Sequence, residues 1–297
     1  MIANRGIALL VTVFFIMLIT LSVGVGLKYI NESAKSIEKE QFLFQTTVIL
    51  DDVLRILQTL KELEQVGSAV DLSTFLLTSE VIPFQSNGVE VVIKFSSARS
   101  RINPNALKDK DRLDAFKLFL SRKSINTVYG DILVDSMSGV KEDQTYVTDI
   151  FNVHPYAFRD YISSSKHLQM INEFYVNSYH DANFKYTDTK EIFYTSKDTN
   201  SSIDLNFATA STYEILLGCD TMRAQELSLR EDVFQTIEEF KLELSAEEQI
   251  NLSKFNSSIF EHYLDVNIQI MHKDKISNIR FEYNTQLKKG SNFVFEV

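Results

Sequence analysis

The hydrophobic pattern of the chain begins with an apolar segment, residues 7–27, that includes no charged side chain. As a helix this segment would be about 30 Å long, which matches the hydrocarbon thickness of a membrane. Arg5 precedes the segment on its short side, and this positive flank predicts a cytoplasmic N-terminus with the body outside. A secretory signal peptide, cut near Gly24 and Gly26, is the alternative interpretation.

Helical spacing continues beyond the apolar segment. Neither proline nor glycine occurs between Leu27 and Val66, and apolar residues recur at helical spacing. We therefore predict that the same helix continues through residues 28–66 and ends at Gly67. A plain membrane anchor has no need of such a continuation. The apolar positions are Ile30, Ile37, Phe44, Val48, Val53, Leu57 and Leu60.

Alternating apolar and polar residues predict a small antiparallel sheet in two distant parts of the chain. Residues 89–95 form the first such strand. Near the C-terminus, residues 264–270 and 279–283 flank a polar turn at 272–275, which is the pattern of a hairpin. Phe293, Phe295 and Val297 add a last edge strand.

Helical periodicity dominates the long stretch between these strands. We predict helices over residues 113–120, 131–137, 157–162, 211–217, 224–240 and 246–255. The expected fold class is α+β: a long N-terminal transmembrane helix packed on a small antiparallel sheet, with a large helical domain inserted into the sheet. The sheet domain takes residues 67–102 and 259–297, and the insertion, 103–258, divides into subdomains at about 103–200 and 201–258.

The residues before the apolar segment carry a family resemblance. Arg5-Gly6 followed by Ile7-Ala8 resembles the prepilin peptidase site of type IV pilins and type II secretion pseudopilins. The resemblance implies a leader at residues 1–6, cleavage after Gly6, a transmembrane segment at 7–27 and a new N-terminus at Ile7. Most members have glutamate at the fifth mature position, where this chain has Val11. The implied assembly helix includes Leu9, Leu10, Val11, Phe14, Phe15 and Leu18.

Absence of that glutamate is typical of one subfamily, the minor pseudopilin K, in which a helical domain is inserted into a pilin-like sheet. A carboxylate inside a membrane needs a cationic partner, and the first subunit of a fibre has no neighbour ahead to supply one. Two motifs extend the resemblance. Residues 102–107, directly after the first strand, are similar to the family's Ile-Asn-x-Asn-x-Leu motif. Residues 204–216 are similar to the family motif that opens a second helical subdomain. Thr209 or Ser211 would cap the helix that follows.

Charge and composition exclude several classes of function. The net charge of -10 disfavours binding to phosphate backbones, so no nucleic acid is expected. The second motif is also similar to a DNA-binding helix-hairpin-helix, but Asp220 places a negative charge where a phosphate would lie. A single cysteine, Cys219, excludes an intramolecular disulfide. No HExxH, Gly-x-Ser-x-Gly or glycine-rich phosphate loop occurs, so we expect no enzyme.

Calcium is the one cofactor that the resemblance implies, and otherwise we expect none. The family's calcium stretch is similar to residues 133–138, where Asp135 matches the first aspartate and Ser138 replaces the second. Glu142 and Asp143 match the later acidic pair. These three carboxylates are the candidate ligands, because Ca²⁺ prefers several oxygen ligands. A solvated acidic loop is the alternative, and the lost aspartate would weaken any binding.

The resemblance implies a minor pseudopilin at the tip of a type II secretion pseudopilus, anchored once in the bacterial inner membrane with its body in the periplasm. Implied partners are the I- and J-type minor pseudopilins, the prepilin peptidase and the inner-membrane secretion platform. Two alternatives stay open. One is a pseudopilin of a related DNA-uptake (competence) system, and the other is an unprocessed, membrane-anchored binding domain.

Overall fold

The computed structural model describes residues 40–79, 81–86, 89–143, 145–230, 232–272 and 275–296. The chain divides into two compact units, Met1–Arg55 and Ile56–Val297, which we describe separately. The predicted leader and transmembrane segment, with Gly6, Ile7 and the assembly positions Leu9 to Leu18, lie outside the described residues. Within the part of the chain that is described, no helix is both long and apolar enough to cross a membrane.

A helix covers residues 40–59. Phe42, Leu50, Val53 and Leu57 are buried along one stripe of it, whereas Phe44, predicted to belong to that stripe, is 71% exposed. Exposed Val48 departs from the prediction in the same way.

The predicted continuity to residue 66 is wrong. Leu60 has extended backbone (φ -71°, ψ 115°), and the short helix α2, Lys61–Glu64, follows it. The hydroxyl of Thr59 donates to the carbonyl of Ile56 at 3.1 Å and so competes with the regular helix bonds. Beyond the break, Leu63 is buried, which a straight helix would not require.

Five strands form the main sheet, in the order β1-β2-β5-β6-β7, with every neighbouring pair antiparallel. The strands are β1 (Val81–Ser86), β2 (Val89–Ser97), β5 (Tyr263–His272), β6 (Lys275–Asn284) and β7 (Lys289–Glu296). This confirms the predicted antiparallel sheet, including its hairpin and its last edge strand. Strand β1 was missed because Pro83 interrupts the alternating pattern, and a proline is tolerated only where no partner needs its N–H.

One face of this sheet is apolar. Val91 and Phe95 of β2, Val266 of β5, and Ile279 and Phe281 of β6 are all at most 5% exposed. The opposite face carries the polar and charged members of the alternating pattern. Helix α3, Ala69–Ser79, contributes to the apolar side. Its Phe75 meets the Phe95 ring edge-on, with 5.4 Å between ring centroids.

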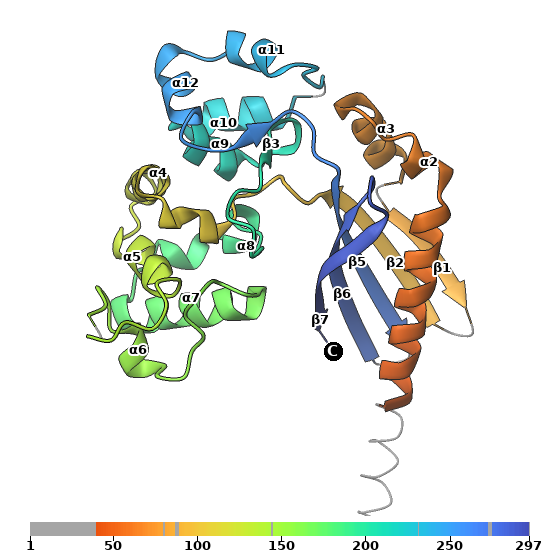
Figure 1. The fold of residues 1–297 in the computed structure, drawn as a ribbon, viewed down its shortest axis with the longest axis horizontal. Coiled ribbons are helices and arrows are strands. Elements are labelled where there is room, and N and C mark those ends of the chain that lie inside the picture. The colour runs from red at the N-terminus through yellow and green to blue at the C-terminus, as the bar shows by residue number, and fades with distance from the viewer. Residues whose placement is uncertain are drawn as a thin grey trace, which may run out of the picture. The chain divides into compact units, whose positions relative to one another are not determined.

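Helices occupy most of the chain between β2 and β5 (Figure 1). The α-helices are α4 (Lys110–Arg122), α5 (Val128–Asp135), α6 (Ile150–Val153), α7 (Ser165–Tyr179), α8 (Thr189–Ile192), α9 (Ala210–Leu217), α10 (Thr221–Ser228), α11 (Ile237–Leu242) and α12 (Ala246–Leu252). Three 3-10 turns, η1 (Pro104–Lys108), η2 (Phe184–Tyr186) and η3 (Leu205–Phe207), complete the helical part. Its buried side chains form one continuous hydrophobic cluster between Ile102 and Phe255, so the two predicted subdomains share a core.

Two of the predicted helices differ from the structure. Residues 157–162 are irregular, and there the buried Ile162 serves as a backbone partner of Asn105. The helix predicted over 224–240 is two helices, α10 and α11, because Thr236 begins a new helix with a capping box to Glu239. The longest helix of the insertion, α7, was not predicted, since Asn, Ser and Tyr dilute its apolar stripe.

Candidate functional site at the junction of sheet and helices

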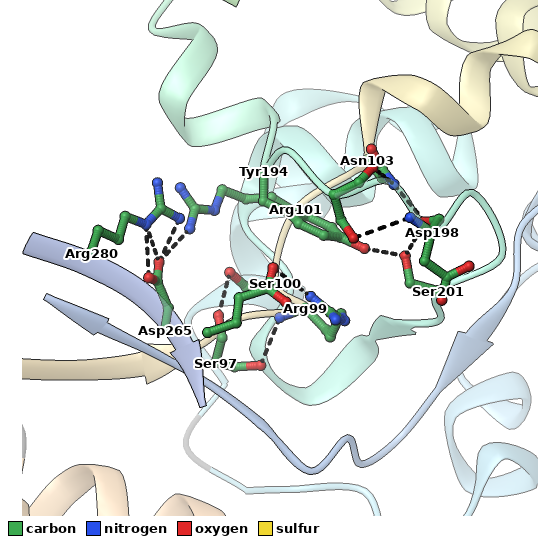
Figure 2. Close-up of polar contacts among 12 residues, drawn as sticks. Ser97, Arg99, Ser100, Arg101, Asn103, Tyr194, Asp198, Ser201, Asp265 and Arg280 are labelled. Carbon is green, nitrogen blue, oxygen red and sulfur yellow. Dashed lines mark hydrogen bonds and ion pairs between the residues drawn. The ribbon is translucent and has the colours of Figure 1, made fainter. Parts of the chain in front are cut away.

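The chain leaves the sheet at Ser97, the last residue of β2, and turns directly into the helical insertion. The hydroxyl of Ser100 donates to the Ser97 carbonyl at 3.1 Å, and the Ala98 N–H donates to the Tyr263 carbonyl of β5 at 3.0 Å. Figure 2 shows this turn and the polar side chains around it. The insertion thus begins where β2 and β5 are still paired, since Ser97 lies opposite Leu264.

Arg99 is the first buried charge of the junction, at 4% exposure. Its Nη1 lies 2.9 Å from Oε1 of Glu282 on β6. The guanidinium lies over two aromatic rings, 4.2 Å from the centroid of Tyr263 and 4.9 Å from that of Tyr194. Tyr263 belongs to the sheet and Tyr194 to the helical insertion, so one cation contacts both parts of the fold.

Asp265 of β5 holds two further arginines (Figure 2). Nη2 of Arg101 lies 2.8 Å from Oδ2, and Arg280 of β6 binds in a fork, with Nε 2.7 Å from Oδ1 and Nη2 2.6 Å from Oδ2. Arg101 also donates to the Lys190 carbonyl at 2.8 Å. Burial, and next the repulsion from Arg280, lower the pKa of Arg101. Removing one partner of such a buried group leaves an uncompensated charge.

The five charges depend on one another because of the strand pairing. Asp265 and Glu282 lie directly opposite each other on β5 and β6, an arrangement that places like charges in contact. Arg99, Arg101 and Arg280 surround the two carboxylates and reverse the local balance to +1. Two of these arginines come from the junction, so the segment that begins the insertion supplies the cations that offset the two carboxylates on the polar face of the sheet.

Asparagine side chains fasten the next turn of the chain. Asn103 caps η1, since its Oδ1 accepts from the Asn105 N–H at 3.1 Å, and its amide donates to the carbonyls of Ser196 and Asp198. The Asn105 amide binds Ile162 as a peptide group would: Nδ2 donates to the Ile162 carbonyl at 3.0 Å and Oδ1 accepts from its N–H at 2.6 Å. Asn105 is fully buried and also donates to the Ser196 carbonyl.

The second motif repeats this construction. Asp204 caps η3 by accepting from the Asn206 N–H at 3.2 Å. The Asn206 amide pairs with both backbone groups of Phe234, at 2.9 Å and 2.7 Å, and also donates to the Ile259 carbonyl at 2.7 Å. Each motif begins at a parallel pairing, Ile102 with residue 193 and Ile203 with residue 257. Both parts of the insertion therefore begin with the same arrangement: a capping side chain, followed two residues later by an asparagine that binds a distant backbone segment.

Asp204 differs from its counterpart Asn103 in carrying a titratable group. Its side chain is fully buried, and the second oxygen accepts from the Glu261 N–H at 3.2 Å. Burial raises the pKa of Asp204 to about 7, although the hydrogen bonds from Asn206 and Glu261 oppose the shift. The carboxyl group of Asp204 is thus a buried titratable group within the hydrogen-bonded second motif.

Of the two predicted caps of α9, Thr209 is the one observed, because its hydroxyl accepts from the Thr212 N–H at 3.2 Å, whereas Ser211 lies inside the helix. At the other end of α9, Gly218 has φ +63° and closes the helix in the left-handed conformation. Arg122 Nη1 donates to the carbonyls of Gly218 and Cys219. The carbonyl groups of this loop therefore bind Arg122 at the end of α4, and these bonds connect α4 to the end of α9. Burial raises the pKa of the Cys219 thiol to about 11, which agrees with a packing role for that side chain.

The three calcium candidates lie in different surroundings. Asp135 is buried, and its carboxylate accepts from Val147 N–H, from Thr148 N–H and from the Thr148 hydroxyl. Glu142 and Asp143 are exposed on the following loop. Among the described residues, no group of three or more Asp, Glu, His or Cys side chains could hold a metal ion.

Calcium binding therefore stays a prediction. A melting temperature measured in millimolar calcium and again in EGTA tests it. A rise in calcium that Asp135→Asn removes would support the site, and equal melting temperatures would dismiss it.

The junction residues that the sequence analysis missed are charged: Arg99, Arg101, Asp265, Arg280 and Glu282. Asp265, Arg280 and Glu282 occupy polar positions of the predicted strands, which the alternating pattern assigns to solvent. The sequence feature that could have indicated these residues is the position of Arg99 and Arg101, just before the first asparagine motif.

Comparisons with known proteins find similarity only in structure. No family model matches the sequence, and no curated protein matches it. A chain of the GspK-GspI-GspJ complex, from the type II secretion system of enterotoxigenic Escherichia coli, is similar with a TM-score of 0.55 and 13% identity. The alignment covers 87% of this chain and 97% of that one. The chain therefore shares its fold with a component of that complex.

Proposed function

We propose that this chain is the K-type minor pseudopilin of a type II secretion system, placed at the tip of the pseudopilus. There it initiates assembly and supports protein export across the outer membrane. The observation that carries the proposal is the fold: a five-stranded antiparallel sheet with a helical insertion between adjacent strands, similar over 87% of the chain to a component of the GspK-GspI-GspJ complex.

The junction supports a role as a terminal subunit. Arg99 and Arg101 join the insertion to the polar face of the sheet, and Asn103 and Asn105 fix its first turn. A large helical body held this firmly behaves as one block with the sheet. Such a block on a fibre subunit obstructs the stacking of another subunit on the same side, which suits a subunit that begins the fibre and is not followed at that end.

The leader sequence adds the membrane part of the proposal. Cleavage after Gly6 by the prepilin peptidase would make Ile7 the N-terminus of a helix embedded in the inner membrane, with the body in the periplasm. Val11 in place of glutamate suits a subunit that has no neighbour ahead of it. Expected partners are the I- and J-type minor pseudopilins and the inner-membrane secretion platform. A competence pseudopilin would have the same architecture, and gene neighbours distinguish the two systems.

Processing is the first test. The full chain is expressed with and without a prepilin peptidase, and its N-terminus is sequenced. We expect Ile7 as the first residue with the peptidase and Met1 without it, and a Gly6→Leu variant should keep Met1 in both. A wild-type chain that keeps Met1 beside an active peptidase would contradict the proposal and favour an unprocessed, membrane-anchored binding domain.

Assembly is the second test. We expect the processed chain to co-purify with I- and J-type pseudopilins from membranes. Val11→Glu introduces a carboxylate into the membrane segment without a partner, and should reduce the number of pseudopili that are started. Val25→Ile, a conservative change in the same segment, is the matched control. Equal numbers of fibres from Val11→Glu and wild type would argue against a tip position.

A further inference from the structure

A groove of about 750 Å³ runs between the helical insertion and the last strand of the sheet. Its walls come from α7, from the segment around α8, and from β7. Val294 and Phe295 line the β7 side, and Gln169 and Asn172 of α7 lie among the lining residues of the helical side. The groove is therefore a feature of a single compact unit of the chain and has one sheet edge as a wall.

Strand β7 is an edge of the sheet, because β6 is its only neighbour in the strand order. An edge strand carries N–H and C=O groups that no other strand satisfies. The opposite edge, β1, contains Pro83, which lacks an N–H and blunts that edge. The described part of β7 contains no proline. Of the two edges, β7 is the one without a proline among its described residues, and its pairing with β6 shifts register between Arg280 and Glu282.

The side chains of β7 divide between two faces. Phe293 stacks on Phe281 of the apolar face, with 5.1 Å between ring centroids, yet it remains 40% exposed, and Phe295 is 51% exposed. Val294 lies opposite Arg280 in the strand pairing, and both line the groove. A strand added beside β7 would therefore place one set of side chains beside Phe293 and the other set beside Val294 in the groove.

The groove is basic although the chain carries a net charge of -10. Lys166 and Lys190 line it and are exposed, and neither ammonium group has an ion pair or hydrogen bond to any residue that the structure describes. The only carboxylate among the lining residues is Asp188, which already caps α8 by accepting from the Lys190 N–H at 2.9 Å. Two lysines without an ion pair among the described residues therefore line the groove.

We propose that this groove binds an extended acidic segment of another polypeptide, which adds to β7 as a sixth strand. Its backbone pairs with the free edge of β7, and its acidic side chains point toward Lys166 and Lys190. Its alternate, apolar side chains continue the row of Phe293 and Phe295. The partner is thus recognised by strand form and by an alternation of acidic and apolar residues. Binding needs only the folded body, so it requires neither cleavage at Gly6 nor assembly of a fibre.

The probe is the peptide acetyl-(Val-Glu)4-amide, titrated into the purified full chain and followed by isothermal titration calorimetry. The control peptides are its lysine counterpart, (Val-Lys)4, and the acidic peptide methylated on every backbone nitrogen, which keeps the charge but cannot pair as a strand. We expect binding of the unmodified acidic peptide alone. Equal binding of the methylated peptide, or no binding of the unmodified one, would overturn the proposal.

Two variants test the geometry. Lys166→Glu with Lys190→Glu should weaken binding about tenfold or more, because it replaces attraction by repulsion at two exposed positions. Lys110→Glu with Lys185→Glu makes the same change of net charge at exposed lysines outside the groove and should leave the affinity unchanged. Equal losses in the two double variants would show that only net charge matters and would refute the site.

Hydrogen exchange locates the bound peptide. We expect slower exchange of β7 amides in the presence of the peptide and unchanged exchange in β1. Protection of β1 instead of β7 would contradict the proposal. Dimerisation of the chain through β7 in the absence of peptide would also overturn it, because a second copy would then be the occupant.

Discussion

Replacing Asp265 by asparagine tests whether the arginine cluster fastens the insertion to the sheet. The substitution keeps the shape of the side chain but removes the charge that compensates Arg101 and Arg280. The side chain of Asp265 is 9% exposed, and those of Arg101 and Arg280 are 13% and 32% exposed, so solvent screens the remaining repulsion only in part. Losing one partner of a buried ion pair costs about 3–5 kcal/mol, and we expect the lower end because Arg280 is partly solvated.

Urea unfolding followed by circular dichroism gives the loss directly. For a unit of this size, about 3 kcal/mol corresponds to a fall in melting temperature of roughly 10 °C. The matched control is Asp131→Asn, because Asp131 forms a single ion pair with Lys117 at 2.6 Å in which both side chains are 27% exposed. That variant should lose less than about 1 kcal/mol.

Equal losses in the two variants would refute the reasoning, because they would show that the cluster is worth no more than a surface pair. The double variant Arg101→Met, Asp265→Asn adds a second check. Removing the cation that Asp265→Asn leaves unpaired should restore part of the lost stability, so the two losses should not add. Additive losses would mean that Arg101 and Asp265 act independently.

Further predictions concern the two asparagine fastenings and the cap of α9. Asp204 binds its proton more tightly when folded (pKa about 7) than when unfolded (about 4), so its contribution to stability is full below about pH 4 and falls as pH rises to about 7. Unfolding free energies measured between pH 4 and 8 should therefore fall less with pH in Asp204→Asn than in the wild type, and parallel curves would contradict this. Asn105→Ala and Asn206→Ala each remove three hydrogen bonds and should cost about 3 kcal/mol in urea unfolding, whereas exposed Asn177→Ala should cost under about 0.5. Gly218→Ala should cost about 1–2 kcal/mol in the same assay, because φ is +63° and the new Cβ would lie 2.9 Å from Nδ2 of Asn251, and an unchanged stability would exclude that strain.

The sheet was predictable because its strands obey a period of two. Ile93 and Phe95 of β2, and Val266 and Ile268 of β5, alternate with polar residues, and all four are buried. The same rule could not find β1, where Pro83 breaks the alternation. Helical periodicity in turn misjudged the length of the N-terminal helix, because it did not predict the extended backbone at Leu60.

The polar junction was predictable only in part. The two asparagine motifs stood out because asparagine followed by a turn favours caps, and Asn103 caps η1 as such patterns do. Their partners are far along the chain: Asn105 pairs with Ile162, and Asn206 with Phe234. Single-sequence periodicity contains no information about such distances. The charged residues of β5 and β6 were likewise predicted to face solvent. Periodicity does not indicate that Arg99 and Arg101, which lie far away in the sequence, cover them in the folded protein.

The position of the insertion explains how so small a sheet tolerates it. Antiparallel neighbours β2 and β5 bring the end of one strand beside the start of the next, and Ser97 pairs with Leu264 at that edge. The chain can therefore leave and return without stretching the sheet, and closing a long loop costs little more than closing a short one. Two connecting segments alone would not fix the orientation of the insertion relative to the sheet, because they can act as a hinge. Arg99 and Arg101 remove that freedom by pairing with Glu282 and Asp265 just beyond the point of exit. Severing these pairs should therefore loosen the insertion before it unfolds the sheet, and hydrogen exchange at the junction should rise earlier than in β5.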